Sequence, residues 1–165
     1  MRGLPRLLIL LGAAILVAPL SSQLLAQQGT NAGQARLLGT WRLDLAKSKY
    51  SPGPPLRSET RVYTTDGTGV KGVIDRVYGD GRREVIEYRA EVDIDVPVSG
   101  SKAYDAIRFK RIDEFTTEGV LSHAGRVFGA SRRVISEDGE TMTITFRRQE
   151  PGDMVDNFAV YRRAR

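Results

Sequence analysis

Apolar and polar residues alternate one by one along much of this chain. In residues 141–146 the apolar side chains of Met142, Ile144 and Phe146 alternate with three threonines. Successive side chains of a β-strand point to opposite faces, so this period of two predicts a strand with one buried face. Threonine and the large apolar residues also favour strands over helices.

The first stretch of this kind is residues 39–45, which holds the single Trp of the chain. Trp41, Leu43 and Leu45 fall on one face and polar residues on the other, so we expect the first strand of the domain here. Residues 51–55 follow with three prolines, which cannot donate to a strand ladder. We expect them to form a loop or a cover segment.

Turn signals rich in Gly, Asp, Ser and Pro divide the rest of the chain, about every 8 to 15 residues. The runs between them are rich in Val, Ile, Thr, Tyr and Phe and are expected to be strands joined by tight hairpins. These runs are residues 58–65, 70–77, 82–91, 93–98, 104–112, 115–121, 126–135, 141–146 and 155–163. We therefore predict an all-β fold, an antiparallel up-and-down meander of about 8–10 strands that closes into a barrel and so removes its edges.

The first 26 residues have the layout of a secretory signal peptide. Two arginines precede an uncharged apolar run of 14 residues, and a cleavage region follows that ends at Ala26. The run is shorter than the roughly 20 residues that span a bilayer, so an uncleaved membrane anchor is the less favoured alternative. We expect residues 27–37 to be a flexible polar tail and residues 38–165 to form one domain, exported to the periplasm or the cell exterior.

The start of the first predicted strand carries a motif. Gly39, Thr40 and Trp41 resemble the Gly-x-Trp signature of the calycin superfamily, which joins lipocalins, fatty-acid-binding proteins and avidins. The longer run from Gly39 to Pro54 resembles the opening of a group of small exported bacterial lipocalin-like proteins. The resemblance covers nearly all of the chain after the leader and implies a lipocalin-like or fatty-acid-binding-like barrel.

In those families an Arg of the last strand packs across this Trp at the closed end of the barrel. The resemblance implies that Arg162 does so here, and its register agrees because Arg162 shares a face with Phe158 and Val160. A buried Trp needs a partner for its indole N–H, and an Arg can stack on the ring. We therefore expect Trp41 and Arg162 to form a structural pair that joins the first strand to the last, rather than to contact a ligand.

The composition of the chain excludes several kinds of site and partner. The chain has no Cys, which excludes a disulfide, a thiolate nucleophile and lipid attachment to an N-terminal Cys. Its net charge is +5, and without the two arginines of the leader 23 basic residues face 20 acidic ones. This balance does not indicate nucleic acid as a partner. We expect no cofactor, and no stable membrane span once the leader is removed.

Few residues are candidates for chemistry. His123 is the only His, and its small neighbours predict an exposed bend, which makes haem or metal ligation the less favoured interpretation. The chain has no Gly-x-Ser-x-Gly elbow, phosphate-binding loop or His-Glu-x-x-His motif. Asp93 and Asp95 share a face and could perform acid–base catalysis, but a solvated strand or loop explains them more simply. We therefore assign no catalytic and no metal-binding residue.

Four residues are candidates for the wall of a ligand cavity. Tyr63, Tyr88 and Phe109 qualify because ligand pockets combine aromatic walls with a few polar groups, although a filled core would use the same residues. The arginine pairs at residues 132–133, 147–148 and 162–163 each split across the sheet, one Arg to each face. Arg132, if it points inward, is the candidate donor to a ligand carboxylate. Cross-strand ion pairing with acids such as Asp156 is the favoured alternative for it.

These features predict an exported barrel that binds a small apolar or amphipathic molecule passively, by burial in a preformed cavity. The alternative from another class is a solid-cored envelope module that acts through protein contacts, and an enzyme built on the barrel comes third. A continuous interior cavity of at least roughly 300 Å³ favours the binder, and a filled interior favours the module.

Overall fold

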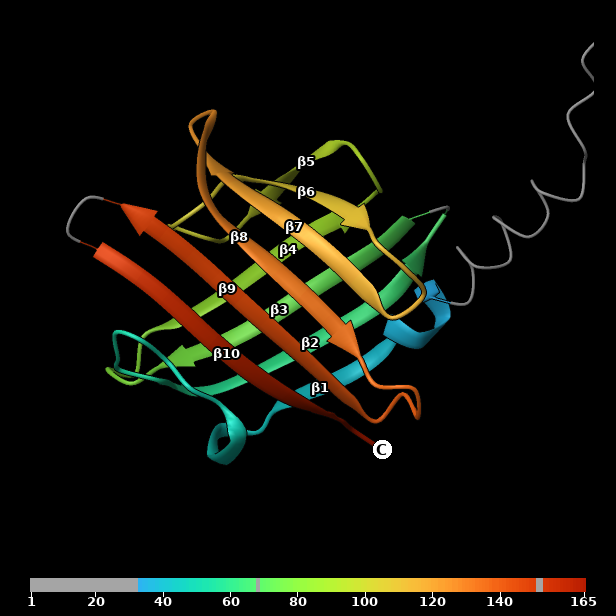
Figure 1. Ribbon diagram of the computed structural model, residues 1–165, viewed down its shortest axis with the longest axis horizontal. Helices are drawn as coiled ribbons and strands as arrows, with labels where there is room; N and C mark the ends of the chain where they lie inside the picture. Colours follow the sequence, from blue (N-terminus) through green and yellow to red (C-terminus); the bar gives the residue numbers. More distant parts are fainter. Residues whose placement is uncertain (1–32, 68, 151–152) are drawn as a thin grey trace, which may run out of the picture.

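The protein is an antiparallel β-barrel that closes on itself (Figure 1). The computed structural model describes residues 33–67, 69–150 and 153–165. Within these ranges the chain forms a helical turn at residues 33–37, then β1 (Gly39–Leu43), η1 (Leu45–Lys47), β2 (Leu56–Asp66), β3 (Gly69–Tyr78), β4 (Arg83–Ala90), β5 (Asp95–Ser99), β6 (Ala106–Arg111), β7 (Thr116–His123), β8 (Arg126–Ile135), β9 (Thr141–Glu150) and β10 (Asp153–Arg163). Each strand pairs with its neighbours in sequence, and β1 pairs with β10. The prediction of an all-β meander closed into a barrel is confirmed.

Tight turns join most of the strands, at positions where the sequence carries turn signals. Gly81 has φ +87° in the β3–β4 turn, and Gly139 has φ +71° in the β8–β9 turn. Both values lie in the left-handed region that glycine enters without steric cost. The N–H groups of these two glycines donate to the carbonyl oxygens of Tyr78 and Ser136, each at 2.9 Å. Backbone hydrogen bonds therefore close both turns.

Alternation along the strands fills the interior with apolar side chains. In β9, Met142 is fully buried and Ile144 is nearly so, as the period of two predicts. From other strands, Trp41, Tyr63 and Ile74 are buried to 2% exposure or less. The apolar face read from the sequence of residues 141–146 is therefore the core face.

The helical turn at residues 33–37 covers one end of the barrel, on the right in Figure 1. Leu37 packs into the core, and its carbonyl oxygen accepts a hydrogen bond of 2.9 Å from the Trp41 indole N–H. The predicted leader at 1–26 and the first part of the predicted tail, 27–32, lie outside the described residues. The rest of that tail is helical because Leu37 finds a buried site over the barrel end. No helix in the described part of the chain is both long and apolar enough to cross a bilayer.

The segment between β1 and β2 continues beside β10, in line with β1, before it reaches the opposite end of the barrel. The Asp44 N–H donates to the Val160 carbonyl oxygen at 2.8 Å. Lys49 and Phe158 then exchange two backbone hydrogen bonds, at 2.7 and 2.8 Å. Residues 51–55 follow as an exposed loop, as the sequence predicts.

Candidate ligand-binding cavity

The barrel encloses a cavity of about 340 Å³. Exposed residues of two loops, Pro52 and Pro54 before β2 and Ala103 before β6, line its mouth, at the end opposite the 33–37 helix. Inward-facing side chains of β2–β4 and β6–β10 form the wall. The apolar and aromatic part of this wall includes Leu56, Ile74, Tyr88, Tyr104, Ile107, Phe109, Leu121, Phe128, Ile144, Phe146, Val155, Ala159 and Tyr161.

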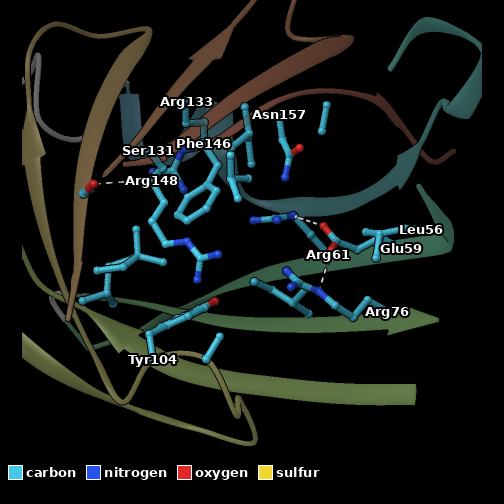
Figure 2. A pocket seen from close by; sticks show the side chains of 18 of the residues that line it. Leu56, Glu59, Arg61, Arg76, Tyr104, Ser131, Arg133, Phe146, Arg148 and Asn157 are labelled. Carbon is cyan, nitrogen blue, oxygen red and sulfur yellow. Dashed lines mark hydrogen bonds and ion pairs between the residues drawn. The ribbon is translucent and has the colours of Figure 1, made fainter. Parts of the chain in front are cut away.

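Charged side chains also line the cavity, and most of them are basic. Arginines 61, 76, 133 and 148 come from β2, β3, β8 and β9, whereas Glu59 of β2 supplies the only carboxylate among the described lining residues. The wall therefore carries an excess of three positive charges. Figure 2 shows Glu59, Arg61 and Arg76 together on one side of the cavity, with Arg133 and Arg148 on the other.

Glu59 holds two of the arginines. Its Oε1 lies 2.6 Å from Nε of Arg61, its Oε2 lies 2.8 Å from Nε of Arg76, and the Tyr161 hydroxyl donates to Oε1 at 2.6 Å. Burial alone would raise the pKa of Glu59, but both arginines and the Tyr161 hydrogen bond outweigh it and hold this pKa below its ordinary value of 4.5. Glu59 is therefore ionised at neutral pH and neutralises one of its two cations.

Arg133 has different surroundings. Its guanidinium carbon lies 5.6 Å from the ring centre of Tyr63 and 5.7 Å from that of Phe109. Both distances are within the range of a cation–π contact. No carboxylate in the described part of the chain forms an ion pair with Arg133. The two aromatic rings stabilise this cation, but no described carboxylate neutralises its charge.

Two buried tyrosine hydroxyls lie near the same cations. Burial alone would raise the pKa of Tyr63, but Arg61 and Arg133 outweigh it and hold that pKa below its ordinary value of 10.0. Burial and the neighbouring Tyr63 hold the pKa of Tyr88 well above that value. The Tyr63 side chain is buried behind the cavity lining, whereas Tyr88 is part of that lining. The deep end of the cavity thus combines the positive charge of Arg133 with the neutral hydroxyl of Tyr88.

Aromatic rings form much of the remaining wall. The ring centres of Tyr104 and Phe128 are 6.2 Å apart, and those of Phe128 and Phe146 are 5.9 Å apart. On another part of the wall Tyr88 and Phe109 are 5.4 Å apart. Separations of about 4.5–7 Å are those of favourable ring pairs. A flat apolar body in this cavity meets aromatic faces on more than one side.

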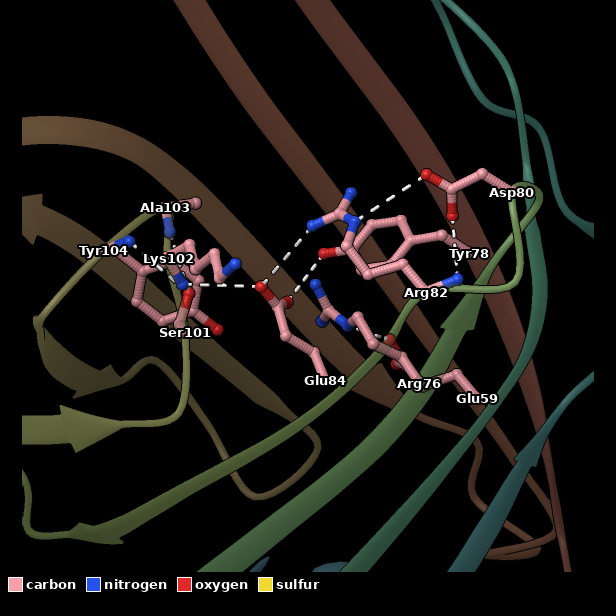
Figure 3. A network of polar contacts seen from close by, with 10 residues as sticks. All are labelled: Glu59, Arg76, Tyr78, Asp80, Arg82, Glu84, Ser101, Lys102, Ala103 and Tyr104. Carbon is pink, nitrogen blue, oxygen red and sulfur yellow. Dashed lines mark hydrogen bonds and ion pairs between the residues drawn. The ribbon is translucent and has the colours of Figure 1, made fainter.

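A polar network braces the mouth (Figure 3). Glu84 accepts a hydrogen bond of 2.7 Å from the Tyr78 hydroxyl and one of 3.4 Å from the Lys102 backbone N–H. The Arg82 guanidinium lies 4.0 Å from the centre of the Tyr78 ring. Burial and the hydrogen bond to Glu84 raise the pKa of Tyr78, so this hydroxyl remains a neutral donor. The network ties the β3–β4 hairpin to the loop between β5 and β6.

Trp41 and Arg163 close the far end of the barrel. The indole ring is fully buried, and the guanidinium carbon of Arg163 lies 4.3 Å from its centre. Arg163 also donates to the carbonyl oxygens of Arg36, Leu38 and Gly139, each at 2.6 Å. These contacts join the last strand to the 33–37 helix, to the start of β1 and to the β8–β9 turn. The pair therefore has a structural role.

The sequence assigned this position to Arg162, and the structure corrects it to Arg163. Counting by two from Phe158 and Val160 assumed that these apolar side chains point inward. They lie on the outer face of β10, where η1 contacts the strand and Val160 is buried. Arg162 shares this outer side and its side chain is half-exposed.

Two of the predicted aromatic wall residues, Tyr88 and Phe109, line the cavity, and Tyr63 is buried beside them under Arg133. The fourth candidate, Arg132, points outward instead. Its side chain is half-exposed and donates to Glu118 at 2.7 Å. This is the cross-strand pairing that the sequence left as the alternative.

A β-bulge explains why Arg133 rather than Arg132 faces the cavity. Leu121 of β7 pairs with Gly129, but the next residue, Ser122, pairs with Val127, so Phe128 is an extra residue in β8. An extra residue shifts the alternation of side chains by one position. Without the bulge, strict alternation from the inward-facing Phe128 would turn residue 132 inward. Beyond the bulge, odd-numbered residues such as Ser131 and Arg133 face inward instead.

Sequence reasoning missed the charged residues of the cavity. One signal was present for Arg148, because it lies two residues beyond Phe146 in the strand whose inward face was read correctly. The others had no comparable signal, since a basic residue in a strand is more often solvated than buried. The missed residues are Glu59, Arg61, Arg76, Arg133 and Arg148.

The remaining candidates lie outside the cavity wall. His123 ends β7 with its side chain 58% exposed, and its Nδ1 is 3.7 Å from Asp105. Asp95 forms an exposed ion pair with Arg108 on the outer surface. No group of three metal-ligating side chains occurs among the residues that the structure describes.

The architecture is a closed barrel of ten antiparallel strands in the described residues, with a Trp–Arg pair at one end, and is consistent with a lipocalin-like fold. In comparisons with known proteins, the chain matches no protein-family model and no curated protein. Its function is therefore argued from the barrel and its cavity.

Proposed function

We propose that this protein is an exported lipocalin-like barrel that binds a small apolar or amphipathic molecule in its interior. The observation that carries the proposal is the cavity of about 340 Å³. Small-molecule pockets begin at roughly 300 Å³ and combine apolar walls with a few polar groups, as this cavity does. Binding is passive in this proposal, because apolar ligand surface leaves water as it enters.

Further features support a relation to the calycin superfamily. Gly39 and Trp41 open β1, and Arg163 of the last strand stacks on the Trp41 ring. Export is supported by the leader-like composition of residues 1–26. The cavity weighs against the alternative of a solid-cored module, because a module that acts through its outer surface is expected to have a filled interior.

Native mass spectrometry of protein purified from its own host, without denaturation, tests the proposal most directly. A bound molecule that survives purification appears as a mass above that of the mature chain, and its release identifies it. The proposal expects such a species, or a cavity that takes up the neutral dye Nile red.

A matched pair of variants locates the binding. Ser131 lines the cavity from β8, whereas the preceding residue, Ala130, is exposed on the outer surface. We expect Ser131→Phe to fill part of the cavity and to weaken Nile red binding by at least roughly tenfold. Ala130→Phe adds the same ring outside and is expected to leave the dye affinity unchanged. Equal affinities for the two variants, or no dye binding by the wild type, would count against an interior site.

A further inference from the structure

Arg133 is a cation of the cavity wall without a counter-charge. Arg61 and Arg76 share Glu59, at 2.6 and 2.8 Å. Arg133 comes from β8, on the side of the barrel away from β2 and β3, and no described carboxylate pairs with it. A charge removed from water is unfavourable unless an opposite charge or hydrogen bonds compensate it. An anionic ligand would supply what the chain does not.

The surroundings of Arg133 fit an acidic group. A guanidinium presents a planar fork of N–H donors that matches a carboxylate in a bidentate manner. The rings of Tyr63 and Phe109 lie 5.6 and 5.7 Å from its central carbon, so they hold the group in place without using its donors. Tyr63 itself is buried behind the guanidinium, outside the cavity lining, so its ring acts as a support for Arg133.

The wall between Arg133 and the mouth favours an aromatic body. Ile144 pairs with Arg133 across β8 and β9, and Phe146 lies two residues farther toward the mouth on the same face. The Phe146 ring stacks on Phe128, and Phe128 on Tyr104. The Arg148 guanidinium lies 4.9 Å from the centre of the Phe128 ring, so a second cation lies beside the aromatic part of the wall (Figure 2).

We infer that the ligand of this cavity is a small aromatic anion whose acidic group binds Arg133 and whose rings lie among Phe128, Phe146 and Tyr104, toward the mouth. This inference rests on the proposed binding function and narrows it to one ligand class. It also assigns a role to the excess of positive charge in the wall. The acidic group binds deep in the barrel, and the aromatic body fills the space between it and the loops.

Calorimetric titration at neutral pH tests the inference with matched probes. 2-Naphthoate and 2-naphthylmethanol share one ring system, and only the first carries a charge. A charge-assisted hydrogen-bonded pair predicts that the wild type binds the acid about 10- to 100-fold more tightly than the alcohol. Octanoate, which has a carboxylate but no ring, tests whether the ligand must be aromatic. Inorganic phosphate tests whether an anion alone is enough for binding. Equal affinities for acid and alcohol overturn the inference, as does binding of octanoate or phosphate that matches that of 2-naphthoate.

Variants assign the preference to Arg133. We expect Arg133→Gln to reduce the acid-to-alcohol ratio to about one, and Arg133→Lys, which keeps the charge without the planar fork, to reduce it partly. Arg132→Gln is the matched control on the outer surface and is expected to keep the ratio. Nile red binding by each variant reports whether the cavity is intact. Loss of the ratio with the dye still bound supports the inference, and an unchanged ratio in Arg133→Gln overturns it. Absence of dye binding by the wild type, together with no retained ligand in native mass spectrometry, instead refutes the proposed function.

Discussion

The carboxylate of Glu59 is the one negative charge that the described cavity wall offers to its arginines, and its removal is a sharp test of the site's electrostatics. The substitution Glu59→Gln keeps the shape of the side chain and removes its charge. Oε1 and Oε2 then no longer neutralise Arg61 and Arg76, whose side chains are only 12% and 18% exposed. The Tyr161 hydroxyl also loses a charged acceptor at 2.6 Å.

The expected cost follows from these contacts. Removing one partner of a buried ion pair costs about 3–5 kcal/mol, because the other charge remains buried and uncompensated. Arg61 and Arg76 keep some access to water, and the Gln amide can still accept one hydrogen bond, so the lower limit applies. We expect a loss of about 3 kcal/mol in the free energy of unfolding. For a domain of this size that corresponds to a fall in Tm of roughly 12 °C.

Urea unfolding followed by circular dichroism measures this loss, with Glu118→Gln as the control. Glu118 forms an exposed pair with Arg132 at 2.7 Å, and the same chemical change there is expected to cost less than about 1 kcal/mol. If Glu59→Gln loses no more than Glu118→Gln, the two arginines of the wall do not depend on Glu59. The electrostatic description of the cavity would then be wrong.

Two further predictions use the same unfolding assay. The folded-state pKa of Glu59 lies below the ordinary value of 4.5, so its ionised form stabilises the fold above that pH, and this contribution is lost as the pH falls further. The difference in stability between wild type and Glu59→Gln should therefore shrink from neutral pH to about pH 3.5, and a constant difference would contradict this assignment. Arg163→Lys loses the stacking on Trp41 and the forked donation to carbonyl oxygens, and should cost about 2 kcal/mol, whereas Arg162→Lys should cost less than about 0.5 kcal/mol. Equal losses would show that Arg163 has no special role in closure.

The strands and their order could be predicted from the sequence because local signals determine them. Glycines such as Gly81 and Gly139 mark turns that need a positive φ, and the apolar face of β9 is the core face. The short helix at 33–37 could not be predicted in this way. Its sequence has no apolar periodicity, and it forms because Leu37 fills a site that exists only once the barrel has closed.

The inward face of a strand was harder to predict than the strand itself. In β10 the apolar Phe158 and Val160 indicated the wrong face, because η1, more than a hundred residues earlier in the chain, packs against this strand and Val160 is buried on the outer face. In β8 the bulge at Phe128 shifts the alternation by one residue, so that Arg133 faces inward and Arg132 forms the cross-strand ion pair that was the favoured alternative. Both features depend on contacts between segments far apart in the chain, to which a count along one strand is insensitive.

A shift of one residue matters more for the ligand than for the fold. The order of the strands around the barrel does not itself determine whether Arg132 or Arg133 faces inward. The two arrangements differ in whether a cation without a counter-charge faces the cavity. On the outer surface, charges are matched across strands, as in the pairs of Arg132 with Glu118 and of Arg147 with Asp156. The net charge of the whole chain cannot reveal this division, because it counts both surfaces together. The chemistry of the ligand therefore depends on the register of side chains in a few strands.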